Sequence, residues 1–205
     1  MSHALVLEGH HVRLEPLTML HAEGLLAAVS EDQSTYVWTR APAPDAAGVV
    51  AFIDEALAEP ARLAFATLWT DEGRIVGSTS FFAEQWPWGG HTGPSDAPDA
   101  VEIGGTWLAA SAQRTAVNTE AKLLMLSHAF DVWQVQRVSL KTDARNERSR
   151  AAIERLGARF DGILRRHMPA LGPAGGTRDS AFFSILPDEW PDVRARLETR
   201  LRQSN

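Results

Sequence analysis

The segment 101–143 constrains the fold most, because it has the pattern of two strands joined by a loop and a helix. The runs "VEIGGTWLA" (101–109) and "VQRVSLKTD" (135–143) are strand-like, and over 119–130 apolar residues recur on one helical face. Two strands connected through a helix pair in parallel. Ligands of such units bind at the carboxyl ends of the strands and the amino end of the helix. The sequence therefore predicts a binding site around the loop 111–119.

The rest of the chain predicts antiparallel strands and further helices around one sheet. A turn at 71–73 joins two strand-like runs, 62–70 and 74–82, into a hairpin, and Gly157 is placed to end a short helix. The segment 84–100 is rich in Gly, Pro and Asp and predicts a long loop. The other expected elements are helices at 18–30, 44–60, 146–157 and 188–203, and strands at 4–7, 11–14, 162–171 and 178–186. This order predicts a mixed α/β fold in a single domain over residues 1–205, with an inserted loop at about 84–100.

The composition limits the classes of function. The chain has 205 residues, a formal charge of −6 and no cysteine, which excludes disulfides, thiolate metal ligands and a cysteine nucleophile. The negative charge argues against broad binding of nucleic acid. The sequence contains neither a signal-peptide pattern nor an apolar run of membrane-spanning length, so we expect a cytoplasmic protein without a membrane partner. The histidines lack metal-ligand spacing, and no metal is expected.

The loop before the helix at 119–130 has two interpretations. It holds Arg114, Thr115, Asn118 and Thr119 and runs directly into a helix start. Unpaired N–H groups and the positive end of the helix dipole bind phosphate at such a place, and Arg114 would add a cationic side chain. The alternative is a surface loop followed by a capped helix. The spacing alone slightly favours the capped helix.

A second pair of polar residues follows the strand at 135–143. Asn146 and Ser149 are three positions apart at a helix start and therefore lie near one face of that helix. Either side chain is able to cap the helix or to hydrogen-bond a ligand that lies across the strand ends. Taken alone, the pattern favours capping.

Together, these segments resemble the GNAT (Gcn5-related N-acetyltransferase) superfamily, in its RimJ/RimL-like ribosomal-protein N-acetyltransferase branch. The resemblance rests on "EIGGTWLAASAQRTAVNTEAKLLMLSHAF", "RVSLKTDARNERSRAAIERLGARFDGILRRHM" and "RDSAFFSILPDEW". It implies a mostly antiparallel sheet that splays at a central parallel strand pair, with helices on both faces. It also implies acetyl transfer from acetyl-CoA to a primary amine, either a protein N-terminus or a small-molecule amine, in a protein that forms a homodimer.

The resemblance also assigns the acetyl-CoA site. The family's loop pattern Q/R-x-x-G-x-G/A falls on 113–118, where Gln113 matches and Ala116 and Asn118 depart from the usual small residues. Asn tolerates the left-handed conformation, so the departure bears on the strength of CoA binding more than on the fold. The backbone of 102–109 would pair with the pantetheine arm. The residues implied for cofactor binding are Trp107, Leu108, Ala109, Gln113, Arg114, Thr115, Ala116, Val117, Asn118, Thr119, Asn146 and Ser149.

For catalysis, the resemblance points to Glu102 and Ser149. Acetyl transfer to an amine needs a base for the ammonium proton and an acid or hydrogen-bond donor for the CoA thiolate. Glu102 lies at the start of the splayed strand and is the implied base, directly or through water; an exposed strand-end carboxylate is the alternative. The superfamily often uses a tyrosine as the acid, but the only tyrosine here is the distant Tyr36. Ser149 is the implied substitute.

The acceptor site is expected beside the loop 84–100. Its candidate walls are Trp38, Trp86, Trp88 and His167, since aromatic faces suit a cationic amine. A solvated loop without substrate contact is the alternative. The competing function for the whole chain is a non-catalytic acyl-CoA-binding or regulatory module.

Overall fold

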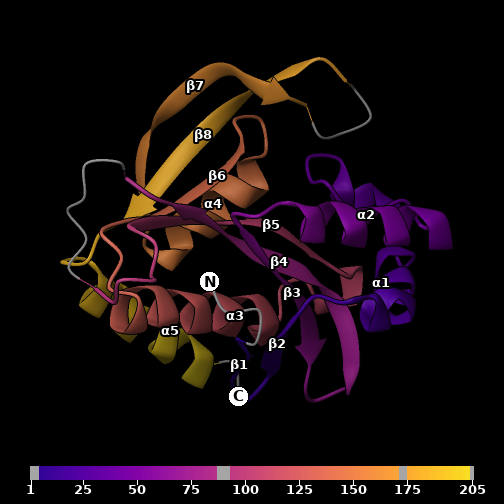
Figure 1. The fold of residues 1–205 in the computed structure, drawn as a ribbon, viewed down its shortest axis with the longest axis horizontal. Coiled ribbons are helices and arrows are strands. Elements are labelled where there is room, and N and C mark those ends of the chain that lie inside the picture. Colours follow the sequence, from indigo (N-terminus) through magenta and orange to yellow (C-terminus); the bar gives the residue numbers. More distant parts are fainter. Residues whose placement is uncertain (1–4, 87–92, 171–174, 204–205) are drawn as a thin grey trace.

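An eight-stranded sheet organises the molecule (Figure 1). The computed structural model describes residues 5–86, 93–170 and 175–203. The strand order is β1-β2-β3-β4-β5-β6-β8-β7, and neighbours are antiparallel except β5 and β6. The strands are β1 (Leu7–Glu8), β2 (Val12–Pro16), β3 (Arg62–Trp69), β4 (Arg74–Glu84), β5 (Ala100–Leu108), β6 (Val138–Asp143), β7 (Arg159–Pro169) and β8 (Thr177–Ile185). The α-helices in the described residues are α1 (Ala22–Val29), α2 (Ala46–Ala58), α3 (Ala116–Ser127), α4 (Glu147–Leu156) and α5 (Trp190–Arg202).

Helices cover both faces of this sheet, as predicted. Adjacent residues of a strand point to opposite faces, so Ser78 and Thr79 of β4 mark the two sides. On the first side Trp107, which is opposite Ser78, meets Phe52 of α2 with ring centroids 6.1 Å apart. On the other side the Thr79 hydroxyl donates to Met125 Sδ of α3 at 3.7 Å. α1 packs with α2, and α3 with α5 (Figure 1).

Most of the predicted elements are present with shifted ends. The predicted hairpin is β3–β4, and Gly73 in its turn has φ +63°, a left-handed conformation that glycine adopts without strain. The predicted helix at 146–157 is α4, and Gly157 follows its last turn with φ +107°. The predicted helix at 18–30 begins as a 3-10 turn, Met19–His21, and continues as α1. In the described part of the chain, no helix has the length and apolar character that a membrane crossing requires.

β5 and β6 part soon after they begin to pair. Their parallel pairing covers only two residue pairs and ends at Glu102 and Ser139. β5 remains paired with β4 as far as Leu108, and β6 remains paired with β8 as far as Asp143. Each strand therefore follows its antiparallel neighbour, and β5 bends further at a bulge where Gly105 has φ +59°. Beyond Glu102, one edge of β5 has no strand partner among the described residues.

A buried carboxylate fastens α3 to the N-terminal hairpin. Glu120 of α3 accepts hydrogen bonds from the backbone N–H groups of His10, His11 and Val12 at 2.9, 2.6 and 2.8 Å. A Cβ atom at Gly9 would lie 2.5 Å from this carboxylate, so the turn before β2 needs a glycine. Glu120 therefore sets the position of α3 relative to the sheet.

Replacing Glu120 by alanine should lower the free energy of unfolding by about 2–4 kcal/mol, because three backbone donors lose a charged acceptor. Urea denaturation of Glu120→Ala measures this loss. Glu154→Ala is the matched control, since Glu154 is also a helical glutamate but is exposed. A loss no larger than that of the control would show that Glu120 does not anchor α3.

Candidate active site

Two cavities adjoin where β5 and β6 part. The larger has a volume of about 900 Å³ and the smaller about 620 Å³. The residues that line both are Trp38, Thr39, Thr106, Asn118, Ser149, Ala152 and Leu156. These residues belong to the segment before α2, to β5, to α3 and to α4. The shared lining therefore joins the two spaces at the strand separation.

The loop at the head of α3 is shorter than predicted. α3 begins at Ala116, and its N-cap is Thr115, whose Oγ1 accepts from the Val117 N–H at 3.3 Å. The prediction that the helix starts at Thr119 was wrong, because Thr115 rather than Thr119 supplies the capping oxygen. Ala116 and Asn118 consequently lie in the first helical turn, where the backbone does not require glycine. The left-handed residue of the loop is Arg114, with φ 66°.

Hydrogen bonds hold this loop against the end of β5. Gln113 Nε2 donates to the Leu108 carbonyl at 2.9 Å, and its Oε1 accepts from Arg148 at 2.7 Å. The Tyr36 hydroxyl donates to the same Leu108 carbonyl at 3.1 Å. The cationic residues that line the larger cavity are Arg114, Arg145, Arg148, Arg155 and Arg200, against a single acidic lining residue, Glu147. The larger cavity therefore suits a ligand with several negative charges.

The entry to α4 closes the other side of the larger cavity. Asp143 accepts hydrogen bonds from the Arg145 backbone N–H, Nε and Nη2 at 3.0, 2.9 and 2.8 Å. These bonds from Arg145 hold the pKa of Asp143 below its usual value, although burial opposes them. The Arg145 guanidinium lies 4.5 Å from the ring centroid of Trp38, which joins this loop to the segment before α2. Asn146 Oδ1 accepts from the Ser149 N–H at 3.0 Å, so Asn146 caps α4.

Most residues predicted for cofactor binding line the larger cavity: Trp107, Leu108, Gln113, Arg114, Thr115, Asn118, Thr119, Asn146 and Ser149. Ala109 and Val117 have fully buried side chains, so only their backbone is available to a ligand. Ala116 lines a third cavity of about 290 Å³ beside Arg114. The indole Nε1 of Trp107 is buried and has no acceptor among the described residues. Its ring packs edge-on against Tyr36 and Phe52, with centroids 5.9 and 6.1 Å away.

The smaller cavity contains an ion pair at its base. Lys141 Nζ of β6 lies 2.6 Å from Glu102 Oε2 of β5, and both side chains are largely buried. Gly104 leaves room for this carboxylate, because a Cβ atom at that position would lie 2.6 Å from Glu102 Oε1. Glu102 therefore places a carboxylate in the lining of the smaller cavity.

Of the three arginines that line the smaller cavity, Arg40, Arg62 and Arg178, the last two are held by serine hydroxyls. Arg62 Nε donates to Ser80 Oγ at 2.9 Å, and Arg178 Nε donates to Ser180 Oγ at 2.9 Å. Neither guanidinium has a carboxylate within ion-pair distance in the described part of the chain. Burial lowers the pKa of both groups. Sequence reasoning missed them, because no motif surrounds either residue.

The residues predicted for the acceptor site are dispersed. Trp38 lines both cavities. Trp86 lines neither, and its backbone N–H donates to Asp99 Oδ2 at 2.6 Å. Trp88 lies outside the described residues. His167 lines neither cavity; its Nδ1 lies 3.0 Å from Ser180 Oγ, and burial together with nearby cationic groups lowers its pKa.

Lys122 of α3 is a buried cationic residue of the smaller cavity that sequence reasoning did not single out. Only 5% of the residue is exposed, and its Nζ lies 3.1 Å from Thr79 Oγ1 and 2.8 Å from Thr106 Oγ1. Burial lowers its pKa to about 7. On an amphipathic helix a lysine usually lies on the solvent face, so helical periodicity alone gives no signal for this position.

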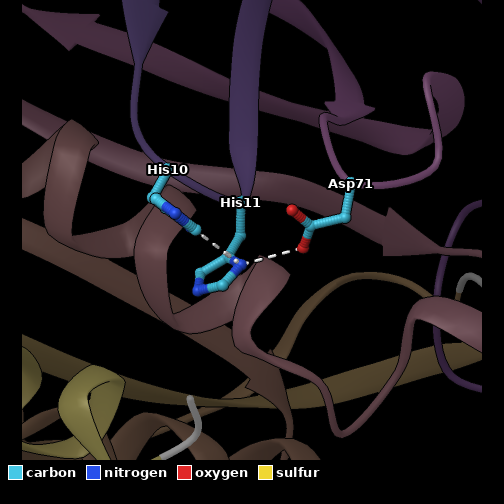
Figure 2. A group of neighbouring side chains, drawn as sticks. All are labelled: His10, His11 and Asp71. Atoms are coloured by element: carbon cyan, nitrogen blue, oxygen red, sulfur yellow. Dashed lines mark hydrogen bonds and ion pairs between the residues drawn. The ribbon is translucent and has the colours of Figure 1, made fainter.

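His10, His11 and Asp71 form a cluster (Figure 2). His11 and Asp71 line the third cavity together with Arg114 and Thr115. His11 Nδ1 lies 2.9 Å from Asp71 Oδ2 and 3.4 Å from His10 Nδ1. The Trp69 indole also donates to Asp71 Oδ2, at 3.2 Å. Hydrogen bonds from His11 and Trp69 lower the pKa of Asp71. The cluster connects the β1–β2 and β3–β4 turns, a proximity that spacing in the sequence does not reveal.

Known families and structures match this arrangement. The model of the family described as "Acetyltransferase (GNAT) domain" matches residues 11–159. A GCN5-related N-acetyltransferase from Brucella melitensis is 30% identical, with a TM-score of 0.82 over 97% of this chain and 86% of that one. A protein of T. thermophilus that is described as an acetyltransferase is 38% identical, with a TM-score of 0.80 over 96% of each chain.

More distant structures share the fold. Mycobacterium smegmatis RimJ, solved in complex with CoA-disulfide, is 22% identical, with a TM-score of 0.72 over 92% of this chain and 88% of that one. Curated protein sequences contain no significant match to the chain.

Asp143→Asn tests the loop that precedes α4. The folded-state pKa of Asp143 is lowered, so its stabilising effect is present above the unfolded value of 3.8 and is lost as the pH falls through the folded value. The variant should lose about 1–3 kcal/mol of unfolding free energy at neutral pH, and its difference from the wild type should narrow below about pH 4. Urea denaturation between these pH values measures both effects. Asp54→Asn, at an exposed helical position, is the control, and a pH-independent difference would contradict the assignment.

Proposed function

Because this chain belongs to the GNAT acetyltransferase family, we propose that it transfers the acetyl group of acetyl-CoA directly to a primary amine. Membership of this family establishes acetyltransferase activity that depends on acetyl-CoA. The acceptor is the α-amine of a protein N-terminus or a small-molecule amine.

The separation of β5 and β6 is the observation that carries this proposal. It leaves the β5 edge from Ile103 to Leu108 without a strand partner in the described residues, next to both cavities. An extended chain with amide groups, such as the pantetheine arm, is able to satisfy these backbone groups as a strand would. The thioester end of that arm would then lie at the junction, beside Thr106, Asn118 and Ser149.

The larger cavity fits the nucleotide end of CoA. The first-turn N–H groups of α3 and the surrounding arginines present positive charge to phosphates. Bound acetyl-CoA would supply the thioester, while Gln113 keeps the loop fixed to the end of β5.

The smaller cavity fits the acceptor amine. Glu102 provides a negative charge that attracts the ammonium group and accepts hydrogen bonds from it. Ser149 lines both cavities, so its hydroxyl is placed to donate to the CoA sulfur as the thiolate leaves. In this assignment Glu102 orients the nucleophile and Ser149 stabilises the leaving group.

Two measurements test the function itself. Acetyl-CoA at about 100 times its Kd should raise the unfolding free energy by about 2.7 kcal/mol, which a thermal-shift assay detects. A thiol-release assay with peptides that have a free N-terminus, amino acids and alkyl amines should then identify the acceptor class. Binding without thiol release for any of these amines would contradict the transferase proposal.

Arg114→Gly tests the phosphate loop. Glycine removes the cost of about 1–2 kcal/mol that a left-handed backbone carries at other residues, while it also removes the cation. Acetyl-CoA affinity should fall about tenfold without loss of folding stability. Gln134→Gly is the matched control, because Gln134 has φ 54° outside the cavities; this variant should leave the Kd unchanged in isothermal titration calorimetry. Unaltered affinity of Arg114→Gly would exclude a phosphate contact.

Glu102→Gln tests the acceptor site. Removal of the carboxylate charge should lower kcat/KM for the amine about 10–100-fold and leave the acetyl-CoA Kd unchanged. The change leaves Lys141 unpaired, so the Glu102→Gln, Lys141→Met double variant checks that the loss does not come from Lys141. Full activity in Glu102→Gln would remove Glu102 from the site.

A further inference from the structure

Lys122 has an environment that a structural lysine rarely has. Its Nζ is buried between the hydroxyls of Thr79 and Thr106, which are themselves 2.8 Å apart. No carboxylate lies within ion-pair distance of it in the described part of the chain. Burying an ammonium group without a counter-ion is costly, and such a group adapts by losing its proton.

The hydrogen bonds around Lys122 also favour the neutral amine. An ammonium group has three donors, and the described residues offer two acceptors, Thr79 Oγ1 and Thr106 Oγ1. A neutral amine needs fewer acceptors and is able to accept from one of the hydroxyls. The pocket thus accommodates both the ammonium and the neutral form of Lys122, and it favours the neutral form.

The distribution of lysines in the chain points to the same cavity. Of 20 basic residues only two are lysines, Lys122 and Lys141, and all others are arginines. Both lysines line the smaller cavity. Arginine stays protonated in proteins, whereas a buried lysine readily changes its protonation state. Both lysine amines of the chain therefore lie where the acceptor would bind.

We propose that Lys122 is the proton carrier of the acetyl transfer: its neutral amine takes a proton from the acceptor's ammonium group, and its ammonium form gives that proton to the departing CoA thiolate. This inference rests on the function proposed above. Asn118 and Lys122 are one helical turn apart on α3, and both line the smaller cavity. Asn118 also lines the larger one, so Lys122 lies one turn beyond the junction of the two cavities.

The protons and electron pairs balance in this scheme. The deprotonated acceptor nitrogen forms a bond to the thioester carbon, and the carbon–sulfur bond breaks with its electron pair on sulfur. The thiolate takes the proton held by Lys122, which returns to the neutral amine. The second proton of the acceptor nitrogen passes to water, so each turnover releases one proton to solvent.

The pKa of Lys122, lowered by burial to about 7, fits both steps. It lies about one unit below that of an α-amine, near 8, so the first transfer is unfavourable only about tenfold. It lies about three units below that of an alkyl amine, which makes the same transfer unfavourable about a thousandfold. A thiol has a reference pKa near 8.5, so proton return to the thiolate is favourable. The carrier therefore favours α-amines as acceptors.

Other charged groups also line the cavity in which Lys122 titrates. They are Arg40, Glu55, Glu59, Arg62, Glu102, Lys141 and Arg178, from the segment before α2, α2 and its C-terminal end, β3, β5, β6 and β8. None of these groups forms an ion pair with Lys122. Burial is the cause of its lowered pKa.

A direct titration tests the proton carrier without reference to activity. The chain labelled with lysine carrying 13C at the ε carbon should give two lysine signals in NMR, and Lys141→Arg assigns them. The Lys122 signal should titrate about three pH units below the lysine reference of 10.4. A midpoint above about pH 9 would overturn the proposal, because such a lysine stays charged at neutral pH.

Kinetics of two variants give the second test. Lys122→Met removes the amine and also a buried unpaired charge, so the protein should fold; Lys122→Arg keeps the charge but does not release a proton. Both should lower kcat on the order of 10²–10⁴-fold with the acetyl-CoA Kd within about threefold of wild type. The wild-type kcat should fall below an inflection near pH 7, where Lys122 takes up a proton. Both variants should lose this inflection, which a packing role would not remove. Glu154→Gln is the exposed control.

Three results would count against this role. Activity of Lys122→Arg within tenfold of wild type, with the inflection intact, would overturn the proton carrier while the proposed function stands. Stable acetylation of Lys122 at one group per chain, detected by mass spectrometry, would show a dead-end nucleophile instead. Failure of the wild type to bind or use acetyl-CoA would refute the proposed function, and the proton carrier would fall with it.

Discussion

The short parallel contact between β5 and β6 is the constraint on which the rest of the site depends. Each strand has a strong antiparallel neighbour, β4 or β8, and these partners diverge, so the parallel pair ends at Glu102 and Ser139. A sheet that parts in its middle leaves backbone groups that need partners. The bulge at Gly105 keeps β5 on its diverging course. The two cavities and the open β5 edge between them all follow from this separation.

α3 contacts both the N-terminal hairpin and the smaller cavity. Successive parts of one helix have different tasks: Thr115 caps its first turn, Glu120 fixes it to the N-terminal hairpin, and Lys122 reaches the cavity. Because a helix is rigid over such a length, the Glu120 contacts on one side position Lys122 on the other. Stability of the hairpin and geometry of the proposed reaction are therefore coupled through α3.

The sequence predicts those parts of the fold that depend on local chemistry. The β3–β4 hairpin follows from its turn residues, and α4 follows from the capping pair Asn146 and Gly157. The start of α3 was misplaced because Thr115 and Thr119 are equally good caps in sequence. Lys122 gave no signal, since its burial depends on β4 and β5, residues distant in the chain. Long-range packing, which no local pattern encodes, decides such positions.

The scarcity of lysine limits how far the protein is able to acetylate itself. For an enzyme that acetylates amines, lysines on its own surface would be competing acceptors. This chain meets its need for surface cations with arginine, whose guanidinium is not a nucleophile at neutral pH. Its two lysines line the smaller cavity, where Lys141 pairs with Glu102 and Lys122 donates to Thr106. A chain whose other cations are arginines therefore offers few amines of its own to the group that the enzyme transfers.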